Sequence, residues 1–223
     1  MAYRPEGSRS NTGPAPGDSE ARAYLADFAA LLHTTPHPSV VLDRSWDVVL
    51  ANPAFDALFA RILPHPTAMP RDNLMRFVLF HPDAGSVLAE HESRWCLPML
   101  VHLAQALDEH GQDAKLLAIR RDVARDPIME AAYQQALPHW LRAVDPAVVQ
   151  HDGSVRPLRH PDPRWGRTCC RVVYGASQTL DLLGYRHLTF VLREPSVPEP
   201  SASRASGARR SSGHLRVVPA ADA

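Results

Sequence analysis

The stretch HPSVVLDRSWDVVLANPAF, residues 37–55, decides the fold. Two runs rich in β-branched apolar residues, 39–42 and 46–51, stand on either side of a short polar break, which is typical of a β-hairpin. The residues that follow, Asn52 and Pro53, predict the start of a helix, because an Asn side chain caps free N–H groups and Pro suits the first helical position. The stretch therefore predicts two strands and then a capped helix.

Apolar residues at helical spacing continue this helix to Ile62 and predict a separate amphipathic helix at 19–33. Residues 73–80 are expected to form a short helix, and the chain from 83 to 143 is mostly helical in pattern. Three further strands are predicted, at Val155–Leu158, Thr168–Tyr174 and His187–Leu192. The order predicts an α+β fold: a five-stranded antiparallel sheet with a large helical insertion covering one face.

The composition predicts one globular domain between two disordered tails. Residues 1–18 and 196–223 are rich in Gly, Pro and Ser, which leaves 19–195 as the folded part. The chain has 24 basic and 24 acidic residues, which counts against a dedicated nucleic-acid binder. Three cysteines and the lack of a long apolar run predict a reduced cytoplasmic protein without a signal peptide or membrane span. A single lysine among many Arg, Ala and Pro residues is typical of a GC-rich bacterial genome.

At this point the sequence resembles a known family. Residues 37–55 resemble the opening of a PAS-type domain, and about 21–195 resembles the ligand-binding domain of MmyB-like transcription regulators from actinobacteria. The matching segments lie in the same order and at the same spacing along the chain. They are Trp46-Asp47-Val48 with Ala51-Asn52, Asn73-Leu74-Met75-Arg76-Phe77, Asp126-Pro127, Trp140, Leu158, His160-Pro161 and Gly166.

This resemblance implies a PAS-like sensor domain, in a family whose members carry a preceding helix-turn-helix of the XRE type and in some cases hold a fatty-acid-like ligand. About 20 residues precede the first predicted helix here, whereas a helix-turn-helix domain needs about 60. We therefore expect ligand sensing without direct DNA binding. The signal would pass to a helix-turn-helix partner or through a homodimer formed by residues 19–33.

A concave sheet closed by helices predicts an apolar ligand pocket with a few polar groups. Arg76 and Arg171 are the candidates for binding a ligand carboxylate, because guanidinium binds carboxylate through two hydrogen bonds; the alternative is a surface arginine or a structural ion pair. The apolar candidates could instead simply fill the core. They are Leu50, Phe59, Met75, Phe77, Met99, Leu103, Trp140, Val172, Tyr174 and Phe190.

Metal binding, haem and catalysis have little support in the sequence. His91, Cys96 and His102 are spaced by five and six residues, which does not place three ligands on one α-helical face. A single His102 or His139 could hold haem, but a lone histidine on a helix is usually structural. The motifs of zinc sites, serine hydrolases and nucleotide-binding loops are missing from the sequence. We therefore expect no enzyme activity, no metal and no cofactor.

Two alternatives to a ligand sensor stay open. The first is an interaction protein with a filled core and no ligand. The second is a DNA-binding regulator whose contact comes from the basic tail, or from residues 114–137 with Arg120, Arg121 and Arg125 imitating a helix-turn-helix. Neighbouring acidic residues, including Asp122, Asp126 and Glu130, cancel much of that positive charge.

Overall fold

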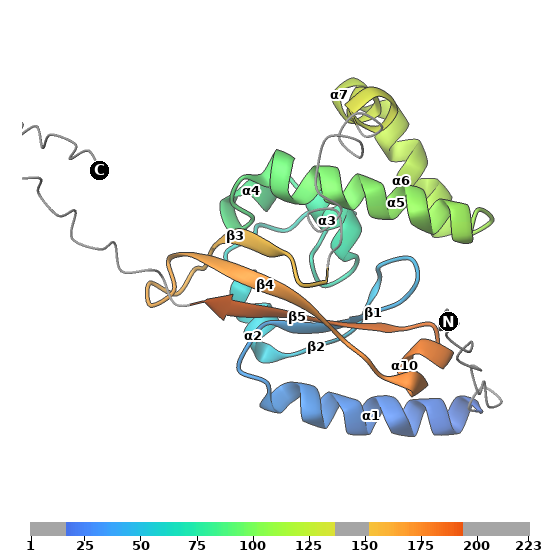
Figure 1. Cartoon of the computed structure of the whole chain (residues 1–223), viewed down its shortest axis with the longest axis vertical. Coiled ribbons are helices and arrows are strands. Elements are labelled where there is room, and N and C mark those ends of the chain that lie inside the picture. The colour runs from blue at the N-terminus through green and yellow to red at the C-terminus, as the bar shows by residue number, and fades with distance from the viewer. Residues whose placement is uncertain (1–16, 137–151, 194–223) are drawn as a thin grey trace, which may run out of the picture.

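The structure is a computed structural model that describes residues 17–136 and 152–193 (Figure 1). Five antiparallel strands form one sheet in the order β2-β1-β5-β4-β3, so the last strand lies between the first and the fourth. This confirms the predicted α+β fold and all five predicted strands. The strands are β1 (Ser39–Leu42), β2 (Val48–Ala51), β3 (Val155–Arg159), β4 (Arg167–Gly175) and β5 (Arg186–Arg193).

Helices lie on both faces of the sheet (Figure 1). One long helix, α1 (Asp18–Thr34), lies on the face that we call the outer face. The other helices of the middle of the chain form a layer over the opposite, inner face, as predicted for the insertion. This helical layer comprises α3 (Leu74–Phe80), α4 (Ala84–Val87), the π-helical turn η1 (Glu92–Cys96), α5 (Leu97–Glu109), α6 (Ala114–Arg125), α7 (Pro127–Ala131) and a second π-helical turn, η2 (Ala132–Ala136).

The hairpin and the capped helix follow the prediction from residues 37–55. The Asp43 side chain accepts hydrogen bonds from the backbone N–H groups of Ser45 and Asp47 and so holds the turn. Asn52 caps α2 (Pro53–Leu58) by accepting from the Phe55 N–H at 2.9 Å. The helix is shorter than predicted: it ends at Leu58, and a turn carries the chain on to the proline that follows Leu63.

Asn52 does more than cap α2. Its Oδ1 atom also accepts from the Ser39 N–H at 2.9 Å, and its Nδ2 group donates to the carbonyl groups of Leu32, Thr35 and His37. The side chain is completely buried. One amide group therefore joins the end of α1, the start of β1 and the start of α2.

Side chains alternate along β4, as its sequence pattern predicts. Cys170 and Val172 are buried on the inner face, whereas Cys169 and Arg171 lie on the outer face. The short helix α10 (Gln178–Leu182), capped by Ser177, joins β4 to β5 and was not predicted. A five-residue helix has too few turns to show a hydrophobic period.

An ion pair joins helix α6 to helix α7. Arg120 forms two hydrogen bonds to Glu130 on α7, at 2.6 and 2.9 Å, and stacks over Tyr133. Up to Ala136, where this described part of the chain ends, the segment after Asp126 is a short α-helix that continues as the π-helical turn η2. Arg120, one of the basic residues proposed to imitate a helix-turn-helix, is thus engaged within the chain.

Some predictions fall on residues that the structure does not describe. Both predicted tails fall outside the described residues, except for residues 17 and 18. Helix α1 begins at Asp18, one residue earlier than predicted. The predicted helix continuation after Pro138 lies outside the described residues too, and so do Trp140 and His139.

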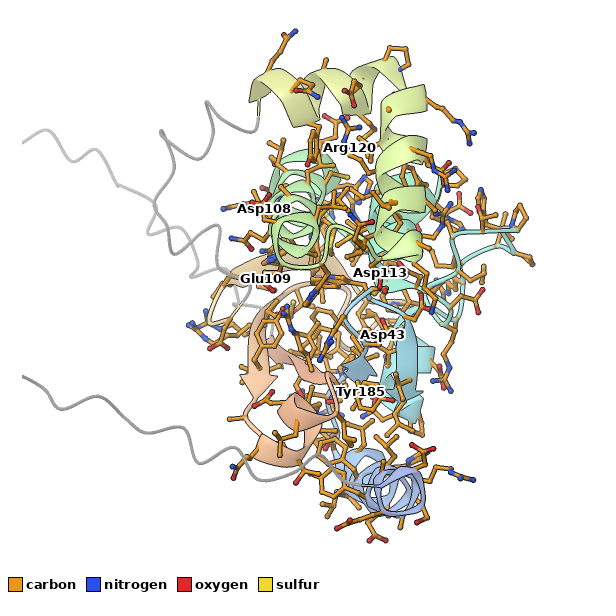
Figure 2. All side chains as sticks on the ribbon, turned by 90° about the vertical axis from the view of Figure 1, so that its right-hand side faces the viewer. Asp43, Asp108, Glu109, Asp113, Arg120 and Tyr185 are labelled. Atoms are coloured by element: carbon orange, nitrogen blue, oxygen red, sulfur yellow. The ribbon has the colours of Figure 1, made fainter. Side chains whose placement is uncertain are left out.

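Lys115 connects the hairpin to the helical layer. Figure 2 labels two neighbours of this contact, Asp43 on the hairpin and Asp113 at the start of α6. The Lys115 ammonium group binds Asp47 and lies 3.8 Å from Asp43, both on the hairpin side. Asp113, which caps α6, accepts a hydrogen bond from Ser45 at 3.0 Å. Burial raises the pKa of Asp43, and the nearby Asp47 charge adds to this rise.

Replacing Lys115 with Met should therefore lower the free energy of unfolding by about 1 kcal/mol at low salt, because the carboxylates lose their counter-charge. About 1 M NaCl should remove most of this loss through screening. Urea unfolding at both salt concentrations measures the effect, with Lys115→Arg as the control that keeps the charge. An equal loss at both salt concentrations would show that the contact is not electrostatic.

Candidate functional site

The space between the inner face and the helical layer is the candidate ligand site. A small cavity lies there. It is lined by Phe59 from the segment after α2, Met99 from α5 and Phe190 from β5. Its volume is about 10 Å³, which is room for about one water molecule. The remaining lining residues are apolar as well: Leu58, Leu74, Val78, Leu88, Trp95 and Leu158. Among the described residues this interior is packed more closely than the sequence analysis expects.

Most of the other predicted pocket residues belong to the same buried core. Met75, Phe77, Leu103 and Val172 are 0 % exposed. Phe77 packs edge-on against the Phe59 ring, with 5.0 Å between the ring centres. These predicted residues thus lie close together in space. Both hypotheses, a filled core and a ligand lining, predict this clustering.

Two members of the predicted set lie elsewhere. Leu50 of β2 pairs with Val41, which pairs with His187 beside Phe28 of α1, so Leu50 lies on the outer face and its prediction as a pocket residue is wrong. Tyr174 lies near the end of β4.

A π-helical turn forms part of the cavity wall. Trp95 of η1 lines the cavity and donates from Nε1 to the Pro157 carbonyl on β3 at 3.2 Å. The same turn brings the Cys96 sulfur to 3.3 Å from His91 Nε2. π-helical turns are rare and often occur at functional sites, because they interrupt the regular helical hydrogen bonding.

The contact between His91 and Cys96 was not expected from their spacing. A separation of five residues does not share one face of an α-helix, but the i to i+5 hydrogen bonding of a π-helical turn brings such a pair together. Burial raises the pKa of Cys96 to about 12, so its thiol stays neutral and is a poor nucleophile. The pair does not form a catalytic dyad.

Polar groups gather at one end of the interior. Arg156 of β3 is 2 % exposed; its Nε donates to Ser154 Oγ at 3.0 Å, its Nη1 donates to the Arg94 carbonyl, and its guanidinium stacks over Trp95. Burial lowers the pKa of Arg156 to about 10, so the group stays charged at neutral pH. Arg156 was not among the predicted site residues, although its alternation with Leu158 places both on the inner face.

His102 and Tyr174 complete this polar cluster from α5 and β4. Burial, reinforced by the charges of Arg156 and Arg186, lowers the pKa of His102 to about 4. Burial raises the pKa of Tyr174 to about 12. Both groups are therefore neutral near pH 7, and each has hydrogen-bonding atoms in a mostly apolar surrounding.

An open groove of about 410 Å³ borders the same end of the sheet. Tyr174 and Arg186 belong both to this groove and to the polar cluster. The groove also contacts the α10 segment, and the rest of its lining consists of Asp152, Gly175, Ala176, Asp181 and His187. The polar end of the interior thus lies beside solvent, whereas the apolar part lies deeper.

The two arginines predicted to bind a carboxylate have other positions. The Arg76 guanidinium donates to Asp122 at 2.6 Å and to the Thr67 carbonyl at 2.7 Å, so it has a carboxylate partner within the chain. Arg171 is exposed on the outer face and donates to the Gly153 carbonyl. Of the arginines discussed, Arg156 is the one that faces the interior.

Two searches of the described residues bear on other kinds of function. Residues 17–136 and 152–193 contain no group of three or more His, Cys, Asp or Glu side chains that could hold a metal ion. None of the helices that the structure describes is long and apolar enough to cross a membrane.

Comparison with known families identifies the class of this chain. Residues 26–162 match the family model described as MmyB-like transcription regulator ligand binding domain, and the chain belongs to this family. The match begins within α1 and ends after β3, while the sheet continues through β4 and β5. The family consists of regulator ligand-binding domains and is not an enzyme family. A comparison with curated proteins gives no match.

Proposed function

We propose that this chain is a sensor domain that binds a small apolar or amphipathic molecule, such as a fatty acid, against the inner face of the sheet. The observation that carries the proposal is its membership of the MmyB-like ligand-binding family over residues 26–162. Phe59, Met99 and Phe190 offer an apolar lining for such a ligand. Arg156, which carries a positive charge, and Tyr174 lie where the polar end of such a ligand would be.

The close packing of the interior implies that such a sensor would change its conformation when it binds the ligand. A ligand larger than water fits only when the helical layer moves away from the sheet, so binding favours an opened arrangement. The irregular turn η1 and helix α5, which form the cavity wall, are the elements that would move. A partner regulator with a helix-turn-helix, or a second copy of the chain, would detect the change. We place this activity in the cytoplasm, in keeping with the free Cys96, Cys169 and Cys170.

The small cavity also favours a second candidate function, an interaction domain with a filled core and no ligand. Native mass spectrometry of the purified chain distinguishes the two. A co-purified lipid, or saturable binding of added fatty acids with a rise in Tm, supports the sensor. No added mass and no change in Tm across a series of fatty acids of different lengths supports the interaction domain.

Filling the cavity should block a ligand that enters there. We expect Met99→Trp to weaken fatty-acid binding by about 10-fold or more, because the indole occupies space that the opened site needs. Leu63→Trp is the matched control, since Leu63 is 66 % exposed and does not line the cavity. Circular dichroism checks that both variants fold, and a fluorescent fatty-acid titration measures affinity. Wild-type affinity in a folded Met99→Trp protein would place the ligand elsewhere.

A further inference from the structure

Helix α1 covers one half of the outer face of the sheet. Phe28 of α1 packs edge-on against His187 of β5. The outward-facing Ser39 and Val41 of the neighbouring strand β1 are 0 % exposed. Viewed along its axis in Figure 2, α1 lies below the blue strands β1 and β2, with the orange strands β4 and β5 to one side. The helix therefore seals the part of the face that β1 forms.

The half of the outer face formed by β3 and β4 lies open. Five strands at about 4.8 Å spacing span roughly 19 Å, and a helix is about 10 Å wide, so this half has room for one more helix beside α1. The side chains that point outward from β3 and β4 are exposed or partly exposed, and none of them is buried. They are Val155, Pro157, Arg159, Arg167, Cys169, Arg171 and Val173.

Three arginines stand at regular steps on the open half. In strand register, Arg193 of β5 lies opposite Cys169, which follows Arg167 by two residues and precedes Arg171 by two. Arg167, Arg193 and Arg171 therefore lie on three successive outward rows, about 6.7 Å apart along the strands. Apolar side chains lie between them, since Arg171 pairs with both Val155 and Val191. We call this surface the arginine face and define it by Arg167, Arg171, Arg193, Cys169, Val155 and Val191.

The positive charge of the arginine face is not balanced by acidic side chains. Among the described residues of β3, β4 and β5, none of the outward-facing positions carries Asp or Glu. In the described part of the chain, Arg167, Arg171 and Arg193 form no salt bridge. Arg171 donates to the Gly153 carbonyl at 2.5 Å, a group without net charge. Cationic side chains with apolar ones between them suit a partner that is acidic and partly apolar.

A helix with acidic residues four positions apart fits the steps of the arginine face. Four residues rise about 6.0 Å along a helix, close to the distance of about 6.7 Å between the arginine rows. Acidic side chains at positions i, i+4 and i+8 would each meet one guanidinium, which binds a carboxylate through two hydrogen bonds. Apolar side chains at i+3 and i+7 lie next to them on the same side of the helix.

Other occupants of the arginine face fit less well. None of the helices that the structure describes carries Asp or Glu at three successive four-residue steps, so a second copy of the chain lacks a matching helix. Residues 194–223 carry four arginines against three acidic residues, so this segment does not complement the face in charge. A phosphate backbone makes no use of the apolar side chains between the arginines, and the chain has as many acidic as basic residues, 24 of each.

We propose that the arginine face docks an acidic amphipathic helix of another protein, which lies beside α1 and runs along the strands. Three acidic side chains of that helix pair with Arg167, Arg193 and Arg171, and its apolar side chains cover Val155 and Val191. The arginine face lies on the opposite side of the sheet from the candidate ligand site. The proposal therefore goes beyond the proposed function and does not depend on whether a ligand binds.

A designed peptide tests the proposal on the full chain. The probe is a capped, fluorescently labelled helical peptide of about 18 residues with Glu at three positions four residues apart. Leu stands three residues after the first and the second Glu, and Ala and Gln fill the other positions. Fluorescence anisotropy in about 100 mM NaCl should show saturable binding that weakens as the salt concentration rises. The same peptide with Gln in place of each Glu should bind about 10-fold more weakly or less.

Charge reversal on the arginine face identifies the surface that binds the peptide. Arg171→Glu/Arg193→Glu should weaken binding of the Glu peptide by about 10-fold or more, and should bind a version with Lys in place of Glu more tightly than wild type does. Arg167→Glu/Arg193→Glu is a second variant that keeps the Arg171 contact to β3. The matched control is Arg61→Glu/Arg121→Glu, which changes the net charge equally at two exposed arginines elsewhere and should bind like wild type. Circular dichroism checks that each variant folds.

Four results would overturn the proposal. The first is a wild-type chain that does not bind the Glu peptide, or binds the Gln peptide equally well. The second is a pair of folded arginine-face variants that bind the Glu peptide like wild type. The third is a chain that forms dimers in sedimentation velocity and loses them in these variants, because a second copy would then occupy the face. The fourth is binding of duplex DNA at about 100 mM NaCl that the same variants abolish, because the arginines would then serve a phosphate backbone.

Discussion

Replacing Asn52 with Ala should lower the free energy of unfolding by about 3–5 kcal/mol, a large part of the stability of an ordinary domain. The substitution removes the acceptor of the Ser39 and Phe55 N–H groups and the donor to the Thr35 carbonyl. The Leu32 and His37 carbonyls lose one of two donors and keep the other, the Thr35 N–H and the Ser39 hydroxyl respectively. These groups lie in the buried join of α1, β1 and α2, where unsatisfied hydrogen-bonding groups are most costly. Urea unfolding followed by circular dichroism measures the change.

Two further variants separate capping from the rest of the Asn52 network. Asp126→Ala removes the exposed cap of α7 and should cost only about 1 kcal/mol. Asn52→Asp keeps an oxygen for the Ser39 and Phe55 N–H groups but directs a carboxylate oxygen at three carbonyl groups, so we expect it to be nearly as harmful as Asn52→Ala. If Asn52→Ala costs no more than Asp126→Ala, the role of Asn52 is capping alone.

Acid should destabilise the fold through His102. The pKa of this histidine falls from 6.5 to about 4 on folding, mainly through burial and then through Arg156 and Arg186. The unfolded chain therefore takes up a proton first as the pH drops. Stability is unaffected above about pH 6.5, decreases by about 3 kcal/mol in total between pH 6.5 and 4, and shows no further His102 effect below that range.

His102→Gln isolates this contribution, because Gln does not titrate. Burial also lowers the pKa of His160 and of His187, so the wild-type slope contains their smaller contributions. Urea unfolding at pH 7 and at pH 4.5 gives the free energy of unfolding of each protein. The loss between the two pH values should be smaller in His102→Gln than in wild type. Equal pH slopes in the two proteins would mean that His102 is protonated in the folded state, contrary to its burial against Trp46 and two arginines.

The local patterns were strong enough to predict each strand and the start of α2. The Asn52-Pro53 pair marks the first turn of α2. Alternation along β4 separates Val172 from Arg171, yet both were predicted to line the pocket, and only Val172 faces the interior. The order of the strands in the sheet could not be predicted in this way. Strand β5 pairs with both β1 and β4, and the periodicity of a sequence carries no information about such distant pairing. Core membership of Met75 and Phe77 followed from their apolar character.

The site was harder to predict than the fold because its polar residues depend on tertiary packing. Arg156 was overlooked since an arginine is normally expected at the surface, yet its place two residues before Leu158 on a strand indicates the inner face. Arg76 has the same side chain but pairs with Asp122, which is 46 residues away in sequence. A single sequence gives no means of assigning such a partner.

Lys115 is the one lysine of the 223 residues, which makes the chain a natural substrate for selective amine chemistry. Reagents that acylate amines have this side chain and the N-terminal amine as targets. The hydrogen bond to Asp47 raises the pKa of Lys115, so the reactive, unprotonated form is scarce while the hairpin and α6 stay in contact. The rate of labelling at this position consequently reports how often the Lys115 ammonium group leaves Asp47, without any engineered cysteine or tag.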